Sequence, residues 1–64
     1  MYTATVRYGY GNLSKRIYGR YVFEYDNKPD HKRVMEMAIE LSNKVFDDSD
    51  LFSISAIEID EVKL

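Results

Sequence analysis

The stretch YGYGNLSKRIYGRYVFEY, residues 8–25, decides the fold of this 64-residue chain. Apolar and polar side chains alternate on both sides of its centre, and such alternation is typical of half-buried strands. The central segment GNLS, residues 11–14, supplies residues that tolerate a positive φ, as a tight turn requires. The stretch therefore predicts a β-hairpin whose strands span residues 2–10 and 15–25.

The tyrosines of this hairpin fall mostly on one of its sides. The tyrosine ring is amphipathic, so it can fill a thin core while its hydroxyl reaches the rim. We therefore expect most of these tyrosines to be core residues, together with their apolar neighbours. The expected core side carries Tyr2, Ala4, Val6, Tyr8, Tyr10, Ile17, Tyr21, Phe23 and Tyr25.

The apolar period lengthens to that of a helix between Asp30 and Asp47. Asp30 is suited to cap the start of this helix, and Asn27 is a competing cap one turn earlier. The helix therefore begins near residue 30. Its expected buried side carries Val34, Met37, Ala38, Leu41 and Val45.

Residues 52–62 predict a third strand, because they are rich in β-branched side chains and alternate over 57–60. Ile54 is out of phase with the later isoleucines unless a bulge near Ser55 and Ala56 restores the alternation.

The order of the elements is then β-β-α-β. With the usual right-handed crossover, the third strand lies parallel to the second and beside the first. The sequence therefore predicts a single α+β domain over residues 1–64. We expect a three-stranded sheet of order 2-1-3, with the helix packed on one face.

Size and composition narrow the class of protein. A chain of 64 residues is near the size at which one core is marginal, and oligomerisation often supplies the missing burial. The chain has no cysteine, which excludes a disulfide framework and agrees with a reducing compartment. No apolar run approaches the roughly 18 to 20 residues that span a bilayer, and no signal-peptide pattern opens the chain. We expect a cytoplasmic homodimer that does not bind membranes.

The net charge of −2 hides an asymmetry between the two parts of the chain. Residues 1–25 carry four basic side chains and one acidic side chain, whereas residues 26–64 carry five basic and ten acidic side chains. Such an asymmetry indicates either nucleic-acid contact through the basic part or packing of the two parts against each other.

The basic part contains a candidate ligand-binding face. Tyr18 lies between Arg16 and Arg20 along the second strand, and Arg7 lies on the neighbouring strand. This layout could stack a nucleic-acid base and hold phosphates. The competing interpretation is that Arg7 pairs with Glu58 or Asp60, while the other arginines keep an exposed strand soluble.

The helix contains a candidate dimer or partner stripe formed by Met35, Ile39 and Phe46. The stripe lies about 100° round the helix from the main apolar side, so one sheet should not cover both. Either the following return folds Leu51 and Phe52 over the stripe, or the stripe meets a partner, most simply a second copy.

Catalytic patterns are scarce in this sequence. His31 is the only histidine and has no cysteine nearby, and the serines lack the glycine context of a nucleophile elbow. The acidic segment 47–50 lacks the glycine and the distal glutamate of a calcium loop. We expect no enzyme, no catalytic residue, no cofactor and no bound metal.

These observations favour a small non-enzymatic protein-interaction module, with an inhibitor or an accessory protein among the roles open to it. We expect it to dimerise through the helix stripe and to meet another, unidentified macromolecule through its sheet face or its acidic edge. The alternative is a nucleic-acid-binding protein that uses the basic hairpin face, although a sequence pI near 5.2 argues against it. A candidate acidic surface could instead imitate a nucleic-acid backbone toward a basic partner. That surface comprises Asp47, Asp48, Asp50, Glu58, Asp60 and Glu61.

Overall fold

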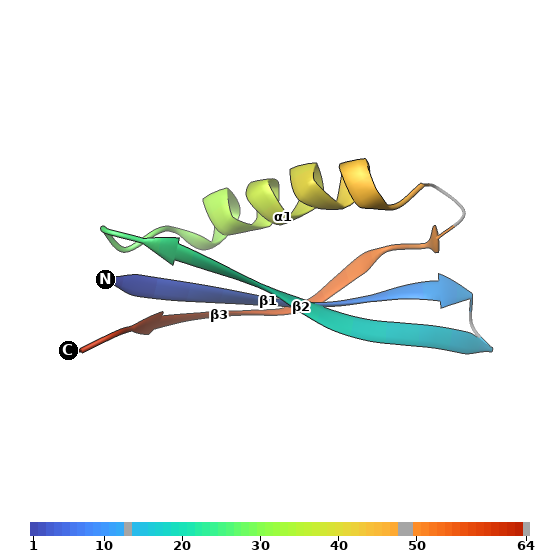
Figure 1. The fold of residues 1–64 in the computed structure, drawn as a ribbon, viewed down its shortest axis with the longest axis horizontal. Helices are drawn as coiled ribbons and strands as arrows, with labels where there is room; N and C mark the ends of the chain where they lie inside the picture. Colours follow the sequence, from blue (N-terminus) through green and yellow to red (C-terminus); the bar gives the residue numbers. More distant parts are fainter. Residues whose placement is uncertain (13, 48–49, 64) are drawn as a thin grey trace.

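A computed structural model describes residues 1–12, 14–47 and 50–63. It contains strands β1 (Tyr2–Asn12) and β2 (Lys15–Tyr25), helix α1 (His31–Val45) and strand β3 (Ser53–Glu61). The strands form one antiparallel sheet of order β2-β1-β3, and α1 lies along one face of it (Figure 1). The predicted β-β-α-β fold and strand order are confirmed. Leu13 of the predicted turn and Asp48 of the predicted acidic surface lie outside the described residues.

The hairpin is regular and longer than expected. β1 and β2 pair without interruption from Tyr2 opposite Tyr25 to Asn12 opposite Lys15. Gly11 has a φ of 102°, and a Cβ there would lie 2.5 Å from the backbone oxygen of Lys15, so glycine is required. The Asn12 Oδ1 atom accepts hydrogen bonds from the backbone N–H groups of Ser14 and Lys15, at 3.0 and 2.8 Å. These local contacts set the register of the whole hairpin.

The predicted bulge in the third strand is confirmed. Arg7 pairs with Ala56 and Tyr8 pairs with Ile54, so Ser55 is the extra residue. The Ser55 hydroxyl donates a hydrogen bond to the Arg7 carbonyl oxygen at 3.1 Å. As a result, the isoleucines on both sides of the bulge pack against the core.

Asp30 rather than Asn27 caps the helix. The Asp30 Oδ1 atom accepts a hydrogen bond from the backbone N–H of Arg33 at 2.7 Å, and the Asp30 carbonyl oxygen accepts one from Val34. The helix ends at Val45, two residues before the predicted end, because Phe46 adopts an extended conformation.

The core lies between α1 and the sheet. Its fully buried residues are Ala4, Val6, Val34 and Ala38. Partly buried side chains surround them, namely Tyr21, Phe23, Tyr25, Ile54, Ile57 and Ile59. Two of the five tyrosines predicted for the core, Tyr21 and Tyr25, therefore pack against it. Tyr2, Tyr8 and Tyr10 are half-buried outside this cluster, and the rings of Tyr8 and Tyr10 lie against Phe46 instead.

The prediction of buried residues was wrong for Met37, which is exposed, for the last turn of the helix and for one hairpin residue. Val45 is 64% exposed, because the chain leaves the helix after it and Phe46 turns toward the sheet instead. Ser42 is buried in this turn and donates its hydroxyl proton to the Ile39 carbonyl oxygen. Ile17 is 55% exposed, because α1 packs chiefly on β1 and β3 and leaves β2 less covered.

Candidate functional site

The face of the sheet opposite α1 carries no further layer among the described residues (Figure 1). We call it the open face. Because side chains alternate along each strand, the register determines which of them it carries. The open face comprises Thr3, Thr5, Arg7 and Gly9 of β1, Arg16, Tyr18, Arg20, Val22 and Glu24 of β2, and Ser53, Ala56, Glu58 and Asp60 of β3.

Large apolar groups on the open face are concentrated on β2. Tyr18 is 72% exposed and Val22 is 56% exposed. The Tyr18 ring lies over Gly9, since a Cβ added at Gly9 would be 3.1 Å from two carbons of that ring. Gly9 is itself buried beneath the ring. The ring therefore has a defined seat on the sheet and presents its other side outward.

Arg16 is engaged within the protein. Its guanidinium donates hydrogen bonds to the carbonyl oxygens of Gly9 and Gly11, both at 3.1 Å, and of Leu51 at 3.2 Å. It also donates to the Ser53 hydroxyl. Arg16 thus connects β2 to β1 and to the start of β3. The structure therefore places this member of the predicted basic set in a structural role.

The other two arginines differ in their surroundings. Arg7 and Arg20 lie opposite each other in the hairpin register. The Arg7 Nε atom lies 3.5 Å from a carboxylate oxygen of Glu58, as the competing interpretation expected. Arg20 is exposed and makes no hydrogen bond or ion pair within the part of the chain that the structure describes. Arg20 is therefore the arginine of the open face that is available to a ligand.

The charges of the open face are balanced and separated along the strands. Glu24 and Asp60 flank Thr3 near the chain termini, whereas the arginines begin at the level of Arg7. Together with Glu58, the open face therefore carries three carboxylates and three guanidinium groups. A phosphate backbone would meet little net positive charge here.

The predicted acidic surface is divided between different parts of the molecule. Asp47 and Asp50 lie at the return after α1, where the Asp47 N–H donates to a carboxylate oxygen of Asp50 at 2.9 Å. Asp60 and Glu61 lie near the chain termini, at the opposite end of a molecule 41 Å long (Figure 1). The structure does not bring these carboxylates together.

The predicted helix stripe is also divided. Phe46 packs in an aromatic cluster, with ring centroids 4.5 Å from Tyr10 and 5.4 Å from Phe52. Met35 and Ile39 remain 43% and 42% exposed. The return after α1 therefore covers the Phe46 end of the stripe through Phe52, and the rest of the stripe faces outward.

The remaining titratable groups do not form a reactive cluster. His31 is exposed at the first residue of α1. Burial raises the pKa of Tyr21, and the neighbouring Tyr8 raises it further; the Tyr21 hydroxyl is buried without a hydrogen-bond partner. Across residues 1–12, 14–47 and 50–63, no three histidine, aspartate or glutamate side chains are grouped as a metal site requires. The same residues include no helix with the length and apolarity needed to cross a bilayer.

The open face thus combines an exposed aromatic ring, an exposed aliphatic side chain and an available guanidinium, an arrangement suited to binding. The hairpin register sets Gly9 directly opposite Tyr18, and this pairing is the sequence feature that could have indicated where the Tyr18 ring lies. No family model matches the chain, and comparisons with curated proteins and with solved structures found no match either.

Proposed function

We propose that this protein is a non-enzymatic protein-interaction module that binds a partner protein through its open face. One observation carries the proposal. An uncovered sheet face holds Tyr18 at 72% exposure beside Val22 and Arg20. Exposed aromatic and arginine side chains provide most of the binding energy in many protein interfaces.

The charge pattern favours a protein partner over a nucleic acid. Arg16 is engaged by four acceptors within the protein, and Arg7 is paired with Glu58. A polyanion would meet the available Arg20 but would also meet Glu24 and Asp60. A partner that offers an apolar centre, a carboxylate toward Arg20 and a basic group toward Glu24 fits this face better.

Through such binding the protein would act as an inhibitor of its partner or as an accessory protein in the partner's assembly. The absence of cysteine suits a reducing compartment, and we propose the cytoplasm on that basis.

The proposal is tested first by comparing what immobilised variants retain from a cell extract. The variant Tyr18→Ala/Val22→Thr removes the apolar centre of the open face. Val45→Thr is the matched control, since Val45 is also exposed but lies on α1. We expect a protein that wild type and the control retain and that the double variant loses. With that protein purified, Tyr18→Ala should weaken binding about tenfold or more.

Two results would contradict the proposal. One is that the double variant retains the same proteins as wild type. The other comes from an amide NMR titration with a random single-stranded oligonucleotide at low and then moderate salt. Shifts at Tyr18 and Arg20 that disappear at moderate salt would favour the nucleic-acid alternative.

A further inference from the structure

β2 is an edge strand with little protection against pairing. It spans 11 residues, contains no proline, and its register with β1 has no bulge. Every second residue of such a strand directs its N–H and C=O groups away from the sheet. The other edge strand, β3, carries a bulge. β2 is therefore the edge at which the sheet can be extended.

We propose that β2 pairs antiparallel with β2 of a second copy of this chain, about a two-fold axis, to form one continuous sheet. The order of charges along β2 indicates that its pairing partner is a second copy of the chain. Basic side chains without a partner among the described residues lie in its first part, at Lys15 and Arg20, whereas Glu24 and then Asp26 follow at its end. Antiparallel pairing brings the basic part of each copy to the acidic end of the other.

The side chains favour one register for this pairing. Centred on Arg20, the pairing would set two guanidinium groups directly opposite each other, which is unfavourable. Centred on Tyr21, it sets Arg20 opposite Val22 of the second copy and diagonal to its Glu24. Centred on Val22, the pairing would set Arg20 directly opposite Glu24, but Ile17 would then face Asn27, beyond the end of β2. The Tyr21-centred pairing keeps Ile17 opposite Tyr25 within the strands, and we therefore assign this register.

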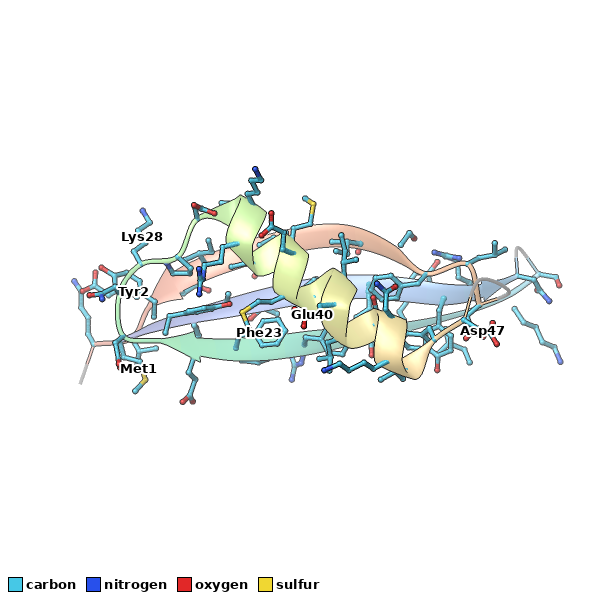
Figure 2. The ribbon with its side chains drawn as sticks, turned by 90° about the horizontal axis from the view of Figure 1, so that it is seen from above. Met1, Tyr2, Phe23, Lys28, Glu40 and Asp47 are labelled. Carbon is cyan, nitrogen blue, oxygen red and sulfur yellow. The ribbon has the colours of Figure 1, made fainter. Side chains whose placement is uncertain are left out.

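The same register covers apolar surface that one copy leaves open on the α1 side. Ile17, which is 55% exposed, would face Tyr25 of the second copy, and Gly19 would face its Phe23. A hollow between β2 and α1 lies at this edge and is lined by Phe23, Met37 and Leu41 with Glu40 and Lys44. Figure 2 shows two of these residues, Phe23 of β2 and Glu40 of α1. The two-fold axis brings the hollows of the two copies to the same seam.

This edge is distinct from the helix stripe but borders the open face, since Arg20 and Val22 belong to both. Met35 and Ile39 lie elsewhere on α1, with Ile39 lining a different hollow together with Leu51 and Phe52 of the return. The open faces of the two copies would lie side by side on the sheet face opposite the helices. Pairing at β2 therefore goes beyond the proposed function, because it joins two copies and makes one wider surface of their open faces.

The test combines mass and cross-linking. Sedimentation equilibrium of the wild-type protein should show a mass that rises from 7.5 kDa toward twice that value with concentration. The chain has no cysteine, so single cysteines report without background. Arg20→Cys and Val22→Cys are mixed in equal amounts and oxidised. Directly opposed residues have Cα atoms about 4.5–5.5 Å apart, within the range for a disulfide.

We expect the disulfide that joins the Arg20→Cys variant to the Val22→Cys variant to make up well over half of the cross-linked dimer, whereas random pairing would give half. The matched control is an equal mixture of Met35→Cys and Ile39→Cys, which should give no such excess. A protein that stays monomeric at millimolar concentration would overturn the proposal. So would a dimer whose excess appears only in the control mixture.

A second measurement does not depend on the folding of any variant. Wild-type protein, half of it isotope-labelled, should show intermolecular NOEs between β2 residues, and NOEs confined to Met35 and Ile39 would overturn the register. None of these measurements uses an external partner, so a failure here is distinguishable from a failure of binding at the open face.

Discussion

Replacing Arg16 with alanine is expected to destabilise the whole sheet. The Arg16 guanidinium is the donor in four hydrogen bonds, to Gly9, Gly11, Leu51 and Ser53. Alanine removes all four donors and the contact between β2 and the segment that enters β3. Because these acceptors belong to three separate parts of the chain, the loss should be felt in global unfolding rather than in local fraying.

The magnitude follows from the number and exposure of these bonds. A hydrogen bond to a charged group contributes roughly 1.5–3 kcal/mol net when it is well buried. The bonds of Arg16 are partly or fully exposed, so water can replace much of what is lost. We therefore expect a loss of about 2–3 kcal/mol in total rather than the full sum. A domain of this size has about 3–10 kcal/mol of stability, so the variant should lose a large part of it.

The assay is urea unfolding followed by circular dichroism, at a protein concentration low enough that sedimentation shows a monomer. Arg20→Ala is the matched control, since Arg20 is on the same face of the same strand but has no partner among the described residues. The control should change the free energy of unfolding by less than about 0.5 kcal/mol. If Arg16→Ala changes it as little as the control does, the structural role assigned to Arg16 is wrong.

Three further predictions concern the turn, the core and the helix cap. Gly11→Ala should cost more than about 2 kcal/mol in urea unfolding, since φ is 102° and the new Cβ would lie 2.5 Å from the Lys15 oxygen; an unchanged midpoint would refute this. Tyr21→Phe should stabilise the protein by about 1 kcal/mol at neutral pH, because the buried Tyr21 hydroxyl has no partner. Its raised pKa means that the unfolded chain releases this proton first, so wild type should lose stability above about pH 10 and the variant should lose less; parallel pH profiles of thermal unfolding would contradict this. Asp30→Ala should cost about 1 kcal/mol through the lost cap on Arg33, while Asp30→Asn should retain most of it in the same assay.

The candidate site was only partly predictable from the sequence. Alternation placed Tyr18 and the arginines on one side of the hairpin, and the structure has them on the open face. The sequence allowed two interpretations of Arg7, and the structure pairs it with Glu58. Arg16 was a candidate ligand group from the sequence, since nothing within the hairpin shows that the Leu51 carbonyl and the Ser53 hydroxyl lie within reach.

The helix stripe shows the same limit. Helical spacing correctly separates Met35, Ile39 and Phe46 from the buried side of α1, but it cannot show what covers them. Phe46 is covered because the bulge in β3 and the return after α1 bring Phe52 to it. Met35 and Ile39 stay exposed, although Ile39 lines a hollow together with Leu51 and Phe52 of the return.

The sequence by itself determined the elements and their order. The two-residue period of the strands, the turn residues 11–14, the two candidate caps Asp30 and Asn27 and the phase break near Ser55 and Ala56 are all local signals. Each acts over a few residues, so each can be interpreted without knowing the rest of the chain. Together with the handedness of the crossover they were enough for the strand order β2-β1-β3.

Only the tertiary structure decided which charged and aromatic groups are available to a ligand. Arg16 is separated by 35 and 37 residues from Leu51 and Ser53, and Phe46 meets Tyr10 of the first strand. Partners so distant in sequence meet only after the sheet has closed on β3. Whether a side chain is available to a ligand depends on those partners. Tyr18, Val22 and Arg20 could therefore be identified as the available groups only in the folded protein.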